Sequence, residues 1–214
     1  KTEVDAKLEV TEISIRALQQ GMPALLFENV KGAKFPLAMN VLASDKRIEL
    51  ALGKHPDQLG EELITFMEDA MPPNPKVFFK HPGTTRRIIS AIPRTTFRST
   101  SQEVVSQPNL DDLPVITSWP DDGGPFITLP QVFTYDPRDG KRNLGMYRMQ
   151  VFDNQTTGMH WQIQKGGGFH FYQAKKMGKD FKIAVALGTD PALLLATVAA
   201  LPEGIDEVMF SGFL

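Results

Sequence analysis

The stretch Asn143-Leu-Gly-Met-Tyr-Arg-Met-Gln-Val-Phe-Asp-Asn-Gln-Thr-Thr-Gly-Met-His-Trp-Gln-Ile-Gln-Lys-Gly-Gly-Gly168 holds two strand-like runs on either side of a polar turn. This pattern predicts a β-hairpin. Because side chains alternate between the two faces of a strand, each strand is expected to carry polar groups on one face. The residues expected to share such a face are Leu144, Met146, Arg148 and Gln150 on the first strand, and His160, Gln162 and Gln164 on the second, with Met159, Trp161 and Ile163 opposite.

The glycine run at the end of this stretch offers room for an anion. Lys165 precedes three glycines, whose backbone N–H groups can approach a ligand without obstruction by side chains. The residues alone therefore predict a sheet with one polar, anion-accepting face. A half-solvated hairpin followed by a flexible loop is the simpler interpretation, since alternating polar residues on strands commonly face water.

The composition is that of an ordinary globular protein, with 214 residues of which 42% are hydrophobic and 22% are charged. The net charge of −2 gives no electrostatic reason to expect a nucleic-acid or membrane partner. The sequence has no cysteine, which excludes disulfides, thiolate metal ligands and cysteine nucleophiles. With no transmembrane-length apolar run and no visible signal peptide, a cytoplasmic protein is expected. The start at Lys1 instead of Met predicts further residues upstream.

Residues 1–107 are expected to form a small α/β layer domain. Helical periodicity predicts one helix capped by Asp5 and another that opens at Pro56 and stops at Pro72-Pro73. Strands are expected at 24–27, 35–41 and 47–52, and residues 74–112 are expected to be irregular. The arginines in that irregular segment favour a solvated surface or an inter-domain contact, although arginines can also hold phosphate; they are Arg86, Arg87, Arg94 and Arg98.

Residues 108–214 are expected to form a second, strand-rich domain. Helices are predicted at 169–177 and after Asp190, with Pro191 in the first helical position. Pro130 predicts an edge position or a bulge in the strand that contains it. The predicted strands are 115–118, 126–135, 144–152, 158–164, 181–187 and a last one from Glu207 after a turn at 202–204.

Several motifs in this order resemble the UbiD family of reversible decarboxylases, which use prenylated FMN. The central resemblance lies in 143–150, Trp161 and Lys165-Gly-Gly, and further motifs lie at 23–32, 112–122, 186–192 and 207–214. The resemblance runs along nearly all of this chain but covers less than half of a family member. It implies an α+β fold in which the small α/β layer domain is followed by a split β-barrel, like that of flavin reductases, that holds prenylated FMN.

The resemblance also implies a metal site. In the family an Asn, a His and a Glu bind a divalent metal, usually manganese, that bridges to the cofactor phosphate. Asn143 and Glu207 occupy matching positions, and Gln164 stands where many members carry His. Oxygen donors of this kind suit Mn²⁺, with K⁺ as a second candidate cation, but Gln lacks an imidazole nitrogen, so weaker or altered metal preference is expected. Without the metal, Asn143 is a turn residue and Glu207 a surface strand residue.

Arg148 matches the active-site arginine of the family, whose guanidinium is expected to grip the substrate carboxylate through two hydrogen bonds. The alternative is an internal salt bridge, because a buried arginine must find an anion. Lys165 and Thr128 are expected to contact the phosphate. The full set expected to line the cofactor is Thr128, Asn143, Met146, Tyr147, Arg148, His160, Trp161, Gln162, Lys165 and Gly166.

The implied reaction is reversible, non-oxidative decarboxylation of an aromatic or α,β-unsaturated carboxylic acid, in which the cofactor carries the difficult chemistry. The acidic proton donor of the family lies beyond Leu214, so 214 residues alone are expected to be inactive. Expected partners are the acid, a flavin prenyltransferase that supplies the cofactor, and further copies joined through a C-terminal domain absent here. A plain flavin-binding module or oxidoreductase, and a subunit without activity of its own, remain alternatives.

Overall fold

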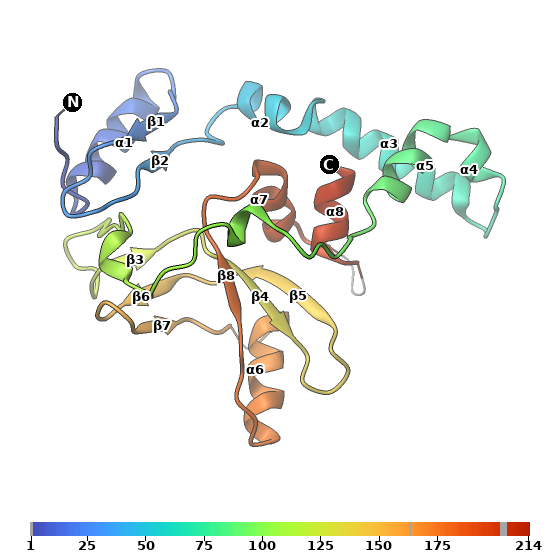
Figure 1. Ribbon diagram of the computed structural model, residues 1–214. Helices are drawn as coiled ribbons and strands as arrows, with labels where there is room; N and C mark the ends of the chain where they lie inside the picture. Colours follow the sequence, from blue (N-terminus) through green and yellow to red (C-terminus); the bar gives the residue numbers. More distant parts are fainter. Residues whose placement is uncertain (1, 163, 202–204) are drawn as a thin grey trace.

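The computed structural model describes residues 2–162, 164–201 and 205–214. In these residues, antiparallel sheets lie at the centre and helices surround them (Figure 1). The α+β class predicted from the sequence is confirmed. The predictions for Lys1, for Ile163 and for the turn at 202–204 lie outside the described residues.

Two three-stranded sheets are connected by a pair of chain segments that bend and run from one sheet into the other. The first has the order β3-β6-β7 and the second the order β5-β4-β8. The strands predicted at 126–135 and 144–152 are each wrong as single strands, because each is divided between the two sheets. The bounds are β3 Phe126–Ile127, β4 Gln131–Tyr135, β5 Arg142–Met146, β6 Met149–Val151, β7 Thr157–Met159 and β8 Ala184–Ala186.

The register shows why these segments bend. Ile127 pairs with Met149 in the first sheet, whereas Gln131 pairs with Met146 in the second. Residues 128–130 therefore face only residues 147–148, which is a bulge of one extra residue. Pro130 lies in this bulge, where its missing N–H costs no ladder hydrogen bond. The bulge predicted from Pro130 is confirmed, and it is the point where the chain passes between the sheets.

The predicted hairpin exists but is shorter than expected. Strands β6 and β7 pair antiparallel, from Met149↔Met159 to Val151↔Thr157. Because β7 ends at Met159, His160, Gln162 and Gln164 do not share the face of a strand, and that prediction is wrong. These residues lie in the connection that leads to helix α6 (Gly166–Lys176), which begins three residues before the predicted Phe169.

Two segments predicted as strands are helices. Residues 47–52 lie in α2 (Asp45–Leu52), which ends at Gly53 in the left-handed conformation that glycine adopts without strain. Glu207 begins α8 (Glu207–Phe213), because the Asp206 side chain accepts the N–H of Met209 and caps the helix. Short apolar runs of this kind fit either type of element, and local capping decided both.

The other predictions for the N-terminal half are partly confirmed. The first helix is α1 (Glu9–Gln19), but Leu8 and not Asp5 lies at its N-cap. The helix that opens at Pro56 is present, whereas the irregular segment expected from residue 74 contains two helices. The bounds are β1 Leu25–Phe27, β2 Leu37–Met39, α3 Pro56–Ala70, α4 Val77–Lys80, α5 Pro82–Ser90, and the 3₁₀ turns η1 Thr100–Gln102 and η2 Leu110–Asp112.

Predictions in the C-terminal half also had mixed outcomes. The strand expected at 115–118 is reduced to isolated bridges at Ile116 and Thr117. Strand β8 was expected to be buried, but it pairs only on its β4 side and Val185 is exposed. The helix after Asp190 is confirmed as α7 (Pro191–Val198), with the Asp190 side chain accepting the N–H of Ala192.

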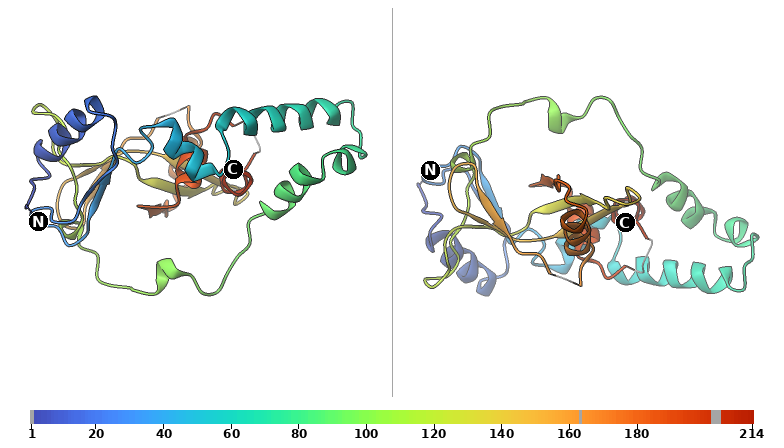
Figure 2. Two further views of the ribbon diagram at one scale, coloured as in Figure 1. Left: turned by 90° about the horizontal axis from the view of Figure 1, so that it is seen from above. Right: turned by 90° about the horizontal axis from the view of Figure 1, so that it is seen from below.

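Helices α3, α4 and α5 form an arm that projects away from the sheets (Figures 1 and 2). Residues 92–109 return from this arm as an extended segment, as Figure 2 shows. The boundary predicted between Gln107 and Pro108 falls in that segment and stays a prediction. The arm meets the body where α5 contacts α8: a Cβ atom at Gly212 would lie 2.9 Å from the Cα atom of Ala91.

We expect Gly212→Ala to lower the free energy of unfolding by about 1–3 kcal/mol, because the added methyl group meets the backbone of α5. Gly60→Ala is the matched control. Gly60 lies inside α3 with nothing within 4 Å of its added Cβ atom, so this change is expected to raise stability by about 0.5–1 kcal/mol through helix propensity. Urea unfolding of both variants measures the two effects, and equal signs would contradict the predicted contact.

Candidate functional site

Strand β5 is an edge strand, and helix α8 supplies hydrogen bonds to its open side. The N–H of Leu144 donates to Oε2 of Glu207 at 3.2 Å. Next to it, Arg142 grips the Asp206 carboxylate, with its Nη2 atom 2.7 Å from each oxygen. Asn143 lies between these two anchor points. The structure therefore brings Asn143 and Glu207, which are far apart in the sequence, to neighbouring positions.

Glu207 carries a carboxyl group in a partly desolvated place. Burial raises the pKa of the Glu207 carboxyl above its ordinary value, and hydrogen bonds from the backbone, including the N–H of Leu144, oppose that rise. A charged carboxylate there lacks part of its hydration. A nearby cation would replace some of the lost stabilisation.

The side-chain amide of Asn143 is directed toward the start of helix α6. Its Nδ2 atom lies 3.4 Å from Oγ1 of Thr134. Its Oδ1 atom lies so close to Gly166 that a Cβ atom there would overlap it. Only glycine at position 166 therefore permits this approach of the amide oxygen to α6.

The Lys165-Gly-Gly-Gly run is the beginning of a helix and not a loop. Lys165 is the N-cap residue of α6, and the three glycines form its first turn. The N–H of Gly167 donates to the Tyr147 hydroxyl at 2.9 Å, whereas the N–H groups of Gly166 and Gly168 have no partner among the described residues. A helix start with free N–H groups attracts anions, and the exposed Lys165 side chain adds a positive charge.

Aromatic side chains hold the start of α6 against β5. The Tyr147 ring is buried and lies 5.0 Å from the Trp161 ring, which stacks on Phe171 at 5.8 Å. A Cβ atom at Gly167 would lie 2.7 Å from Trp161 and 2.8 Å from Tyr147. Tyr147 and Trp161 thus form the support of the helix start, and their predicted contact with a cofactor stays a prediction.

Arg148 lies at the bulge and is exposed. Its guanidinium sits over the Phe126 ring, 5.0 Å from the ring centre, and it forms no ion pair with any described residue. No described residue supplies the internal salt bridge considered for a buried arginine, and that alternative stays untested. Thr128 is exposed at the same bulge, and the N–H of His160 donates to the Arg148 carbonyl at 3.4 Å.

The remaining predicted site residues lie around this region. Met146 ends β5 and is half-buried, whereas Gln162 and Gln164 are exposed in the connection before α6. No hydrogen bond joins Gln164 to another described residue, so its role as a third metal ligand stays a prediction. No group of three or more His, Asp or Glu side chains within the described ranges is placed to hold a metal ion. The expected ligand set instead combines the amide oxygens of Asn143 and Gln164 with the carboxylate of Glu207.

A buried polar chain behind Asn143 was missed by sequence reasoning. It consists of Thr134 on β4, His170 on α6 and Asp136, all of which are buried. Oγ1 of Thr134 lies 2.9 Å from Nδ1 of His170, and Oδ2 of Asp136 lies 3.9 Å from Nε2 of the same ring. Thr134 and His170 are 36 residues apart, so no local pattern could have paired them.

Arg138 keeps Asp136, the acidic member of this polar row, negatively charged. The Arg138 guanidinium binds Asp136 through Nη2 at 2.7 Å and Nε at 3.0 Å and lowers the pKa of that carboxyl from 3.8 to about 2. Burial lowers the pKa of His170, which favours a neutral ring. Arg138 also covers the Phe169 ring at 4.9 Å.

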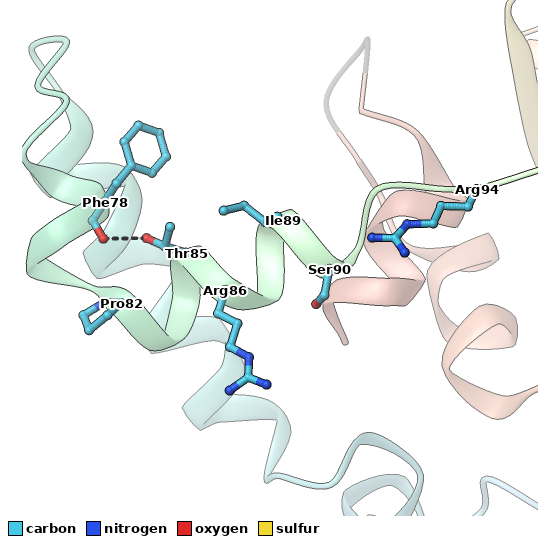
Figure 3. A pocket seen from close by; sticks show the side chains of 7 residues that line it. All are labelled: Phe78, Pro82, Thr85, Arg86, Ile89, Ser90 and Arg94. Atoms are coloured by element: carbon cyan, nitrogen blue, oxygen red, sulfur yellow. Dashed lines mark hydrogen bonds between the residues drawn. The ribbon is translucent and has the colours of Figure 1, made fainter.

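A separate shallow hollow of about 380 Å³ lies on the arm (Figure 3). Figure 3 shows Arg86 and Arg94 at this hollow, on and just after α5. Arg87 points elsewhere: its guanidinium covers the Phe213 ring and approaches Glu62 at 3.5 Å. The predicted arginine cluster is thus divided. No described helix combines the length and the apolar character needed to cross a membrane.

We expect Tyr147→Phe to lower the free energy of unfolding by about 1–3 kcal/mol, because the buried N–H of Gly167 loses its acceptor. Urea unfolding measures the change. Tyr172→Phe is the control, since Tyr172 is exposed and has no partner among the described residues; a change within about 0.5 kcal/mol is expected there. A similar loss in both variants would contradict the assigned role of the Tyr147 hydroxyl.

Asp136 is expected to make stability depend on pH in acid. Its folded pKa of about 2 lies below the ordinary 3.8, so its ionised form stabilises the fold above pH 3.8 and this contribution is lost as the pH falls through 2. Compared with Asp136→Asn, the wild-type protein should gain about 1 kcal/mol at pH 6, after allowance for solvent around Arg138, and almost nothing near pH 2.

Urea titrations between these two pH values measure that difference. The control is Asp180→Asn, because Asp180 is exposed and has no described partner, and it should change stability by less than about 0.5 kcal/mol. A wild-type advantage that persists undiminished to the lowest pH would contradict the assignment.

Two domain families match the sequence. Residues 94–214 match the 3-octaprenyl-4-hydroxybenzoate carboxy-lyase Rift-related domain, and residues 1–67 match the N-terminal domain of the same carboxy-lyase. An uncharacterized protein of Archaeoglobus fulgidus is 44% identical over 100% of this chain and 44% of its own length. A protein of Chlamydia pneumoniae, described as one subunit of a 4-hydroxybenzoate decarboxylase, is 39% identical over 99% of this chain and 36% of its own length.

Solved structures have the same fold. An evolved dimeric form of the UbiD-class enzyme HmfF from Pelotomaculum thermopropionicum, in complex with prFMN, is 27% identical with a TM-score of 0.74, over 100% of this chain and 46% of that one. The vanillic acid decarboxylase of Sedimentibacter hydroxybenzoicus in closed form is 24% identical with a TM-score of 0.77, over 100% of this chain and 44% of that one. The chain thus spans less than half the length of these relatives.

Proposed function

Because the chain belongs to the UbiD family of carboxy-lyases, we propose that it is the cofactor-binding part of an enzyme that reversibly decarboxylates an aromatic or α,β-unsaturated carboxylic acid with prenylated FMN. The observation that carries the proposal is the meeting of three features. The amide oxygen of Asn143 approaches the start of α6, the carboxylate of Glu207 binds the next residue of β5, and two N–H groups at the start of α6 have no partner among the described residues.

These N–H donors and oxygen acceptors suit a phosphate group and a hard cation. The N–H groups of Gly166 and Gly168, which have no partner in the described part of the chain, would hold the cofactor phosphate together with Lys165. Asn143 and Glu207 would hold Mn²⁺ or a similar cation beside it through oxygen atoms, with Gln164 as the third ligand and K⁺ as a further cation. When bound, prenylated FMN supplies the electrophilic centre that accepts the electron pair released as carbon dioxide leaves.

The protein residues provide binding and orientation. Arg148 is an exposed guanidinium without a described anionic partner, and the Phe126 ring supports one of its faces. It would take the substrate carboxylate through two parallel hydrogen bonds. Its place at the bulge, next to Thr128 and Tyr147, supports the proposal, because that carboxylate would then lie beside residues proposed to line the cofactor. No described residue is assigned the proton transfer.

The alternative is a flavin-binding module, or a subunit without decarboxylase activity of its own. Gln164, where many members of the family carry His, favours it, because a weaker cation site would hold the phosphate less firmly. Such a module would bind unmodified FMN and need no metal. As a subunit, it would carry flavin only together with its partner chain.

Native mass spectrometry of the protein made from its own gene, together with a flavin prenyltransferase, distinguishes these functions. Prenylated FMN with one manganese ion, and release of carbon dioxide from a panel of aromatic and unsaturated acids, are expected. Unmodified FMN without metal, and no turnover of any acid, would overturn the decarboxylase and favour the binding module.

We expect Arg148→Lys to lower kcat/KM for the acid by about 30- to 100-fold, because loss of the two-point grip costs roughly 2–3 kcal/mol. Steady-state decarboxylation assays measure this change. Arg98→Lys is the matched control: Arg98 is exposed in the segment that returns from the arm, and activity within about twofold of the wild type is expected. Equal effects of the two changes would contradict the role of Arg148.

A further inference from the structure

We propose that Asp136, His170 and Thr134 form a relay that fixes the orientation of the Asn143 amide, so that its oxygen and not its NH₂ group faces the proposed cation. The three are positioning residues, because they act on the cation only through Asn143. The inference rests on the proposed function, in which Asn143 is a metal ligand.

An asparagine ligand has an orientation problem. The oxygen and the NH₂ group of its amide have nearly the same size, but only the oxygen binds a cation, and a half-turn would direct two N–H groups at the metal. In the structure Nδ2 of Asn143 approaches Oγ1 of Thr134 at 3.4 Å, and Oδ1 faces Gly166. One contact with a hydroxyl group does not settle the orientation, since a hydroxyl can donate as well as accept.

The direction of the Thr134 hydroxyl hydrogen determines the orientation of the Asn143 amide. Thr134 has no exposed surface, and its Oγ1 atom lies between Nδ2 of Asn143 and Nδ1 of His170, which is 2.9 Å away. If Nδ1 accepts, the hydroxyl hydrogen is used there and the oxygen is left to accept from Asn143. If Nδ1 instead donated, the free hydroxyl hydrogen would favour the reversed amide.

Asp136 selects the first of these arrangements. Its Oδ2 atom lies 3.9 Å from Nε2 of His170, and the hydrogen bonds from Arg138 keep the carboxylate negative. A buried negative charge on this side of the ring favours the hydrogen on Nε2, which leaves Nδ1 as the acceptor. The charge of Asp136 therefore determines, through the ring and the hydroxyl, which atom of Asn143 faces the start of α6.

The test measures Mn²⁺ binding to the FMN-loaded protein made from its own gene. The electron paramagnetic resonance signal of free Mn²⁺ reports how much of the metal is unbound. Thr134→Val keeps the shape of the side chain and removes the hydroxyl, so Mn²⁺ should bind about 10- to 100-fold more weakly. Thr134→Ser restores the hydroxyl and should bind within about threefold of the wild type. Urea unfolding of the same samples detects a loss caused by unfolding, and in that case Asp136→Asn replaces Thr134→Val.

Repeating the measurement in an Asn143→Asp protein distinguishes two roles of Thr134, orientation of the Asn143 amide and general support of the site. Asn143→Asp places two equivalent oxygens at the site, so nothing has to be oriented, and Thr134→Val should then change Mn²⁺ affinity by less than about threefold. Equal losses in both backgrounds, or unchanged binding by Thr134→Val in the Asn143 protein, would overturn the relay alone. Failure of the wild-type protein with FMN to bind Mn²⁺ would overturn the metal site and the relay with it.

Discussion

The open edge of β5 is the constraint on which the rest of the site depends. An edge strand presents N–H groups that need partners, and here the carboxylate of Glu207 accepts from Leu144 while Asp206 holds Arg142. These bonds join the last helix of the described chain to the edge of the sheet. They also bring two carboxylates to Arg142 and Leu144, the neighbours of Asn143 in β5, so one backbone requirement both docks α8 and positions the carboxylate of the proposed cation site.

The other half comes from close approach between β5 and α6. Two positions at the helix start tolerate only glycine, because Gly166 faces the Asn143 amide and Gly167 faces Tyr147 and Trp161. Larger residues there would separate the helix from the strand. The N–H of Gly166 has no partner among the described residues and lies at a helix start, where an anion is favoured. Tight packing and the proposed anion binding thus have one cause in this sequence.

The buried polar side chains behind the site form a connected row that leads to Asn143. Asp136, His170 and Thr134 are buried, and burial of such groups is costly unless they are paired. Each has a partner in the structure, and the row ends at the Asn143 side chain. Arg148 is the opposite case, since it is exposed over Phe126 and keeps its hydrogen-bonding capacity for a ligand. The rigid support therefore lies behind Asn143, and the available guanidinium lies at the bulge.

The sequence by itself determined the elements whose signals are local. Helical spacing and the proline at its start predicted α3, Asp190 and Pro191 predicted α7, and Pro130 predicted the bulge, because each signal acts within a few residues of the element. The motif around Asn143 likewise identified the family. Only the tertiary structure decided that Glu207 meets the edge of β5, that each of two predicted strands serves two sheets, and that Thr134 meets His170. Those outcomes depend on contacts between residues far apart in the chain, whose partners no local pattern specifies.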